Sequence, residues 1–186
     1  PLVALFDAEG QSVDTLRENT SGYAALARTP FYLEAGGQVS DTGRLVNEAT
    51  GASAVVEGMV RIKPWLPRAH RIRVESGALH VRDMVTARVD EVARNATRRN
   101  HTATHLLHAA LRTVLGTHVK QAGSLVSPDR LRFDFAHFQP VTSDELLEIE
   151  RIVNGQVVRN TPVATEVKST QEAMASGAMA LFGEKY

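Results

Sequence analysis

The hydrophobic pattern of the sequence changes once, at Asp90, and this change limits the possible fold more than any other feature. Before Asp90, short apolar runs are separated by Gly-bearing turn signals. In residues 70–76 (HRIRVES), alternate positions are apolar, which is typical of a half-buried strand. From Asp90 to Gly116, apolar residues recur at helical spacing. The first 90 residues are therefore predicted to form a small β-barrel or sandwich, and the remainder is predicted to be α+β.

Local signals in the second half predict further elements. Gly116 is a predicted helix C-cap, and a Ser-Pro-Asp turn at residues 127–129 separates two predicted strands. Thr142–Glu145 (TSDE) and Ser169–Glu172 (STQE) are capping boxes, so a helix is expected to begin at each. Residues 161–167 (TPVATEV) are predicted to form a strand.

The chain of 186 residues contains no cysteine, which excludes a disulfide scaffold and a zinc site made of thiolates alone. Any metal site must therefore use His, Asp, Glu or water, and the lack of cysteine fits a cytoplasmic protein. No apolar stretch approaches the roughly 20 residues that span a bilayer, so no membrane partner is expected. Because the chain begins with Pro1 and not Met, we expect it to be cut from a longer protein.

The net charge is zero, but the charges are unevenly distributed. Residues 61–99 hold ten Lys and Arg against four Asp and Glu, a local charge of 10 − 4 = +6. Residues 134–186 hold eight acidic residues and four basic ones, a local charge of 4 − 8 = −4. The basic segment leads directly into a histidine-rich stretch. It is a candidate for contact with nucleic-acid phosphates, and an ordinary solvated surface is the alternative.

Three of the seven histidines lie between Asn100 and Gly116. On a helix His101 and His105, four positions apart, share one face and can both reach one metal ion, as two corners of a zinc tetrahedron. His108 lies near the same face. Thr102 stands where the metalloprotease motif H-E-x-x-H has its Glu, so that mechanism lacks its general base. Packing of the rings in the core, or hydrogen bonds to nearby carbonyls, is the alternative interpretation.

A zinc site needs a third or fourth ligand. The candidates within the chain are His118, His137 and Asp134, but nothing in their spacing distinguishes them. Asp134 fits better as an ion-pair partner of Arg130 or Arg132.

The second unusual stretch is TPFYLEAGGQVSDTG, residues 29–43, which we call the Gly-rich loop. Gly36 and Gly37 allow positive φ angles and close approach to another backbone or a ligand. Gln38 offers both hydrogen-bond donors and acceptors. The stretch matches neither the dinucleotide-binding nor the Walker pattern, so no nucleotide site is indicated. A plain hairpin connection is the alternative.

Four stretches together resemble the editing region of alanyl-tRNA synthetases: TPFYLEAGGQVSDTG, NHTATHLLHAALRTVLGTHVKQAGSLV, LRFDF and GAMALFGEKY. The resemblance covers nearly the whole chain in the same order and is weakest between Leu45 and Met84. Free-standing alanyl-tRNA deacylases share this editing fold, and so, more distantly, does an appended domain of threonyl-tRNA synthetase.

The resemblance implies a small N-terminal β-barrel with the Gly-rich loop (residues 1–90). An α+β editing core of antiparallel strands and helices would follow (residues 91–186), incomplete at its C-terminus. It also implies hydrolysis of tRNA(Ala) mischarged with serine or glycine, in an enzyme that charges tRNA(Ala) with alanine. ATP would be used only by the charging domain, which is absent here. The expected partner is the acceptor end of tRNA(Ala), and no DNA is expected.

The resemblance also assigns roles to residues. Zinc would be held by His101 and His105 and by a later C-x-x-x-H motif, which the family carries beyond the position of Tyr186. Gln121 would line the pocket as a catalytic residue. Thr102 is the second expected catalytic residue, with a place in the core as the alternative. The residues expected at the substrate or tRNA are Gly36, Gly37, Gln38, Arg98 and Arg99.

Three alternatives remain open at this point. The chain could be a tRNA-binding module without catalysis, a free-standing alanyl-tRNA deacylase, or a structural zinc or protein-interaction domain. The role of zinc is equally open, since it could polarise the ester, activate water or orient the substrate.

Overall fold

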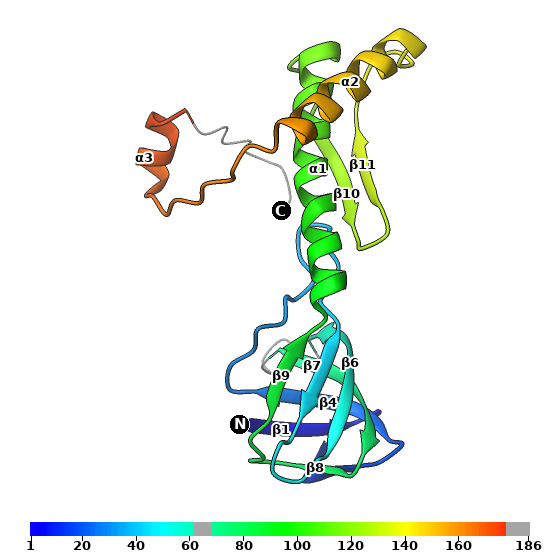
Figure 1. The fold of residues 1–186 in the computed structure, drawn as a ribbon, viewed down its shortest axis with the longest axis vertical. Helices are drawn as coiled ribbons and strands as arrows, with labels where there is room; N and C mark the ends of the chain where they lie inside the picture. Colours follow the sequence, from blue (N-terminus) through cyan, green and yellow to red (C-terminus); the bar gives the residue numbers. More distant parts are fainter. Residues whose placement is uncertain (62–67, 178–186) are drawn as a thin grey trace.

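The computed structural model describes residues 1–61 and 68–177, which form two parts joined by one long helix (Figure 1). The first part is built of antiparallel strands. The second combines helices with a two-stranded sheet, so the predicted α+β class is confirmed. Within the described residues, no helix has the length and apolar character needed to cross a membrane.

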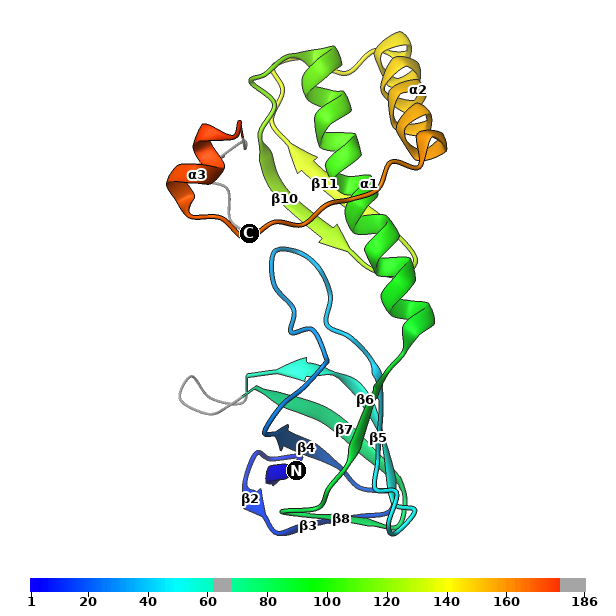
Figure 2. The same ribbon diagram turned by 60° about the vertical axis from the view of Figure 1, so that its left-hand side comes forward.

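Seven strands of the first part form one sheet with antiparallel neighbours, in the order β2-β1-β4-β7-β6-β5-β9. They are β1 (Leu2–Asp7), β2 (Ser12–Val13), β4 (Ser21–Leu26), β5 (Gly43–Val46), β6 (Ser53–Val60), β7 (Ala69–Ser76) and β9 (Thr86–Val89). A small second sheet pairs β3 (Thr15–Arg17) with β8 (Ala78–His80). The main sheet is strongly curled (Figure 2). Among the described strands, no pairing joins β2 to β9, so closure into a barrel stays a prediction.

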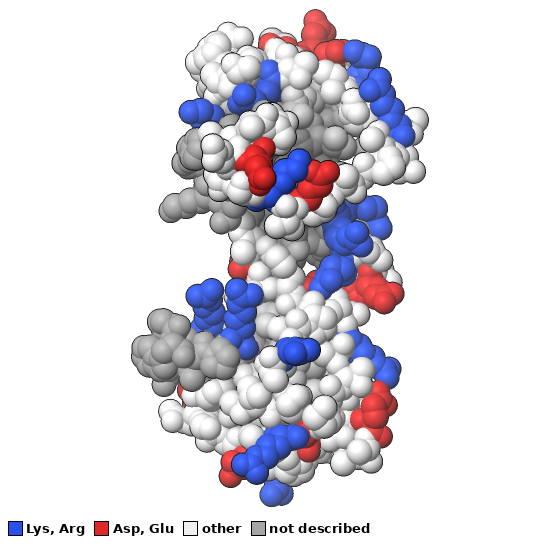
Figure 3. Space-filling model, turned by 90° about the vertical axis from the view of Figure 1, so that its left-hand side faces the viewer, with Lys and Arg blue, Asp and Glu red and all other residues white. Residues whose placement is uncertain are grey.

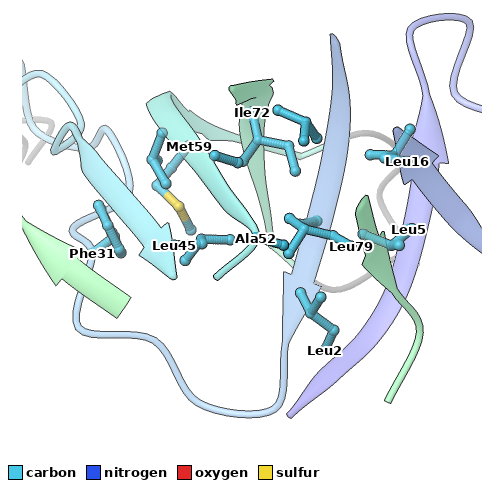
Figure 4. Packing of buried hydrophobic residues seen from close by; sticks show 13 residues of the cluster. Leu2, Leu5, Leu16, Phe31, Leu45, Ala52, Met59, Ile72 and Leu79 are labelled. Carbon is cyan, nitrogen blue, oxygen red and sulfur yellow. The ribbon is translucent and has the colours of Figure 1, made fainter. Parts of the chain in front are cut away.

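The curled sheet encloses the larger of two hydrophobic clusters. In β7 the expected alternation is present, because Ile72 and Val74 are fully buried while Arg71 and Arg73 point to solvent. Figure 4 shows apolar side chains from several strands meeting in this interior. The buried members of the cluster are Leu2, Leu5, Leu16, Ala24, Phe31, Leu45, Ala52, Ala54, Val56, Met59, Ile72, Val74 and Leu79.

The second part contains α1 (Glu91–Leu115), β10 (Gln121–Val126), β11 (Leu131–Phe135) and α2 (Ser143–Arg159). Helix α1 packs against both the β10–β11 hairpin and α2. The small buried cluster of the second part consists of Ala110, Leu111, Val119 and Ile149. The two clusters lie on opposite sides of Asp90 in the sequence, where the hydrophobic pattern changes. The division into domains at residue 90 stays a prediction.

The local predictions for helix ends are confirmed. Asp90 caps the start of α1 by accepting a hydrogen bond from the backbone N–H of Ala93, and Gly116 is its C-cap. Both capping boxes are formed, at the start of α2 and of the short helix α3 (Thr170–Ala175). The predicted strand at residues 161–167 is wrong: the segment is exposed and has no regular secondary structure. Most of the GAMALFGEKY stretch lies outside the described residues.

An ion pair fixes α1 to the long connection between β4 and β5. Asp41, only 8% exposed, accepts hydrogen bonds from Arg94 Nε at 2.7 Å and from the backbone N–H of Tyr32 at 2.5 Å. Arg94 also donates to the carbonyl of Pro30 at 2.8 Å. The hydrogen bond to Asp41, reinforced by its charge, raises the pKa of Arg94 against the opposing effect of desolvation. This connection is therefore held against the first turns of α1.

We expect Asp41→Asn to lower the free energy of unfolding by about 1–3 kcal/mol, because it removes a charged acceptor from a buried hydrogen-bond network. The measurement is urea unfolding. The matched control is Glu48→Gln, which breaks a pair with Arg88 whose two side chains are 59% and 60% exposed. That change should cost less than about 0.5 kcal/mol. Equal effects of the two substitutions would contradict the structural role of Asp41.

Candidate functional site

His101 and His105 lie on one face of α1 with their rings nearly parallel. The ring centroids are 5.1 Å apart and the planes are inclined by 17°. Both rings border a narrow groove of about 30 Å³ between α1, β10 and the Gly-rich loop. The groove is lined by Gly36, His101, Thr104, His105, His108, Gln121, Ser124, Val126 and Phe133. The structure thus brings together both predicted zinc ligands, Gln121 and part of the loop.

The Gly-rich loop of the first part docks on β10 of the second. Gly36 and Gly37 both have positive φ, 59° and 82°. The N–H of Val126 donates to the carbonyl of Gly37 at 2.8 Å, and the N–H of Val39 donates to the carbonyl of Val126 at 3.0 Å. A Cβ atom at Gly37 would lie 2.4 Å from the carbonyl oxygen of Ser124. The close contact therefore requires glycine at position 37.

Two glutamines connect the loop to the groove. Gln38, 9% exposed, accepts a hydrogen bond through Oε1 from Nδ1 of His101 at 2.7 Å. Gln121 donates through Nε2 to the hydroxyl of Ser124 at 3.0 Å, and that hydroxyl donates to the carbonyl of Gly36 at 3.3 Å. Ser124 had no signal in the sequence that marked it as part of a site, because its position depends on the docking of the loop.

Burial lowers the pKa of His105, and the neighbouring His101 and His108 lower it further when they are charged. The neutral ring is the form that binds a metal ion. His108 itself is buried and packs on Phe133, with ring centroids 5.0 Å apart. His108 also lines the groove, and its contact with Phe133 matches the packing alternative.

Three imidazoles line the groove, and the stacked pair His101 and His105 is the pair proposed to bind a metal. Across the described ranges, no group of three His, Cys, Asp or Glu side chains is arranged to hold a metal ion. His118 and His137 hydrogen-bond to each other at 2.8 Å and do not line the groove. Asp134 pairs with Arg132 at 3.0 Å, as predicted. The donor set therefore fits half of a zinc site, and no third ligand is supplied by these three candidates.

Thr102, Arg98 and Arg99 border a different cleft, of about 740 Å³, between α1 and the C-terminal end of α2. The Thr102 hydroxyl donates to the carbonyl of Arg98 at 3.2 Å. Thr104, and not Thr102, lines the groove with the histidines. Its hydroxyl donates to the carbonyl of Asn100 at 2.8 Å. The structure does not bring Thr102 to the histidines, and a catalytic role for it stays a prediction.

A basic cleft of about 710 Å³ lies on the other side of the Gly-rich loop. Its basic side chains are Arg61, Arg68, Arg94 and Arg98, and Gln38 also borders it. Figure 3 shows Lys and Arg side chains on both sides of the middle of the molecule, where the two parts meet, as well as elsewhere on this face. The charge excess of residues 61–99 predicted such a surface, but it did not single out Arg61 and Arg68.

The family description "tRNA synthetases class II (A)" matches residues 1–93, half of the chain. The chain belongs to this family. Its similarity to curated relatives extends over the histidine groove as well. It is 51% identical to the alanine–tRNA ligase of Delftia acidovorans over 185 residues, which is 100% of this chain and 21% of the relative.

Two further relatives agree with this result. The chain is 52% identical to the alanine–tRNA ligase of Acidithiobacillus ferridurans over 178 residues, 96% of this chain and 20% of the relative. It is 50% identical to that of Pseudothermotoga lettingae over 185 residues, 97% of this chain and 21% of the relative. The chain thus spans about a fifth of the length of the curated relatives it matches.

Substitution of Gly37 tests the docking of the loop. Gly37→Ala should be destabilising on two grounds, its positive φ and the contact with Ser124, whereas Gly51→Ala meets only the first. Gly51 has a φ of 77° and open space around its Cβ position. We expect urea unfolding to show a loss of about 1 kcal/mol for Gly51→Ala and a further ~1–3 kcal/mol for Gly37→Ala. Equal losses would show that the loop does not dock as described.

Proposed function

We propose that this chain is the editing part of an alanine–tRNA ligase and hydrolyses the ester bond of tRNA(Ala) mischarged with serine or glycine, with zinc as cofactor. The observation that carries the proposal is the groove. Two stacked histidines of α1, Gln121 of β10 and the Gly-rich loop border it together, in a chain about half identical to alanine–tRNA ligases. The proposal includes closure of the curled sheet as a small β-barrel.

Such an activity has a physical reason. A synthetic pocket built for alanine rejects the smaller glycine only weakly, and it rejects an analogue that merely adds a hydroxyl, such as serine, only weakly as well. A second, hydrolytic site supplies the missing discrimination. A groove bordered by polar side chains is suited to that task.

The residues of the groove would have different roles in hydrolysis. His101 and His105 would hold zinc through ring nitrogens, with the remaining ligands beyond Tyr186. When bound, zinc supplies Lewis acidity at the ester or at a water molecule. The Gln121 amide donates to Ser124 and would orient a polar group of the substrate.

The basic cleft is the proposed path for the acceptor end of tRNA(Ala). Gln38 borders the basic cleft, and it contacts His101, which borders the groove. The cleft and the groove therefore lie on either side of one turn of the Gly-rich loop. Arginines along the cleft can neutralise phosphates and release counterions. A strand lying there would bring its 3′ end toward the histidines. Arg98 and Arg99 reach the neighbouring cleft on α1 and would contact the same strand.

A tRNA-binding module without catalysis is the second candidate function. It is favoured by one observation: the described residues provide two metal ligands and no third. A free-standing deacylase is less well supported, because the matched relatives are about five times as long as the chain.

The catalytic proposal is tested in a full-length alanine–tRNA ligase whose matching region is replaced by this chain. His101→Ala should slow hydrolysis of seryl-tRNA(Ala) by at least ~100-fold, since it removes a metal ligand, and losing even an outer-shell partner of a metal site costs about 10–100-fold. Charging of tRNA(Ala) with alanine should be unchanged.

The control variant is His80→Ala, whose side chain is 55% exposed in the first part. It should leave both rates as they are. Hydrolysis at the wild-type rate in His101→Ala would contradict the catalytic proposal.

The tRNA path is tested by the salt dependence of binding. Arg98→Ala should weaken binding of tRNA(Ala) to the chain and reduce the slope of log K against log[salt] by about 1, because one phosphate contact is lost. Arg17→Ala should change neither, because Arg17 is exposed in β3, which lies at the end of the first part away from α1 (Figure 2). An unchanged slope in Arg98→Ala would remove Arg98 from the path. Filter binding at several salt concentrations measures both quantities.

A further inference from the structure

We propose that Gln38 is a positioning residue that fixes the tautomer and orientation of the His101 ring. The two residues come from different parts of the molecule, Gln38 from the Gly-rich loop and His101 from α1. They meet through a hydrogen bond of 2.7 Å between Oε1 of Gln38 and Nδ1 of His101. The sequence predicted contact of Gln38 with substrate or tRNA, and the geometry assigns it to the histidine.

The direction of this hydrogen bond follows from its chemistry. An amide oxygen has no hydrogen and can only accept, so Nδ1 of His101 must donate. A neutral imidazole carries one N–H, and its other nitrogen then has the lone pair. Gln38 therefore selects the tautomer of His101 in which Nδ1 is protonated and Nε2 can bind a cation or accept a proton.

The position of Gln38 is itself fixed from three sides. Its N–H donates to the carbonyl of Ala35 at 3.0 Å, and its carbonyl accepts from the N–H of Ala35 at 3.3 Å, which closes a tight turn. The backbone of Gln38 also forms a parallel bridge with Val126 of β10. The side chain is 9% exposed. A glutamine held in this way can hold the ring of His101 in turn, whereas an exposed glutamine on a free loop could not.

Fixing the ring matters for the proposed zinc site. Metal-binding histidines usually donate their second ring N–H to an acceptor, which orients the ring and makes the other nitrogen more basic. Gln38 is that acceptor for His101. This consequence rests on the proposed function, whereas the tautomer itself is a property of the chain without metal.

The first test reads the tautomer directly, by ¹⁵N NMR of the histidine rings of the 186-residue chain without metal, at a pH where the rings are neutral. The His101 signals are assigned by their loss in His101→Asn. The wild type should show His101 with Nδ1 protonated. Gln38→Glu keeps an acceptor and should preserve this tautomer, whereas Gln38→Leu should give a mixture with the Nε2-protonated form.

Gln139→Leu is the matched control, because Gln139 is an exposed glutamine after β11 and makes the same change of side chain away from the groove. It should leave the His101 signals unchanged. An Nε2-protonated His101 in the wild type, or an unchanged tautomer in Gln38→Leu, would overturn the proposal. Urea unfolding of each variant ensures that folded chains are compared.

The second test measures zinc affinity by competition with a chelator, in the full-length alanine–tRNA ligase whose matching region is replaced by this chain. Gln38→Leu should weaken zinc binding about 10–100-fold relative to the wild type, and Gln38→Glu should restore most of it. Equal affinities for Gln38→Leu and wild type would contradict a positioning role toward the metal. A full-length ligase carrying this chain that takes up no zinc, while the His101 tautomer still follows Gln38, would count against the proposed function, and it would support the positioning of His101.

Discussion

The backbone pairing between the Gly-rich loop and β10 is the contact on which the candidate site depends. Without it, His101 and His105 are two rings on a helix, with no partner from the first part. With it, the carbonyl of Gly37 and the N–H of Val126 bring Gln38 within hydrogen-bonding distance of His101. Backbone hydrogen bonds define the relative position of two segments more sharply than side-chain packing does, because neither partner has rotamers to choose from.

A second anchor supports the first at the other end of the loop. Asp41 and Arg94 hold the connection to the first turns of α1, and Asp90 caps that helix while its own N–H donates to the carbonyl of Thr42. The loop is thus fixed both where α1 begins and where β10 ends. The groove with the histidines and the basic cleft are separate because the loop is fixed between them.

The sequence predicted those features that depend on neighbouring residues. The Gly116 cap, the two capping boxes and the strand–turn–strand of residues 121–135 each follow from a few adjacent positions, and each is present. The pairing of His101 with His105 follows from helical spacing alone. The strand at residues 161–167 was mispredicted because β-propensity does not supply a partner strand, and none lies beside this segment among the described residues.

Contacts between residues far apart in the sequence could not be predicted from local sequence patterns. The role of Ser124 depends on where the loop docks, and Thr104 faces the groove while Thr102 faces α2, a distinction of half a turn on α1. The resemblance to the family placed Gln121 and the Gly-rich loop near one site. It did not connect Gln38 to His101, a contact that depends on the docking of the loop on β10.

The docking of the loop also sets an order of events during synthesis. Gly37 and Val126 are separated by about 90 positions, so their pairing closes a long chain segment and is slow to form compared with helices and hairpins. A ribosome that has released residues 1–90 has produced all the described strands of the curled sheet, and still nothing that the loop can dock on. Only when β10 has emerged does Gln38 meet His101, so a chain interrupted before Val126 carries both histidines but no organised site.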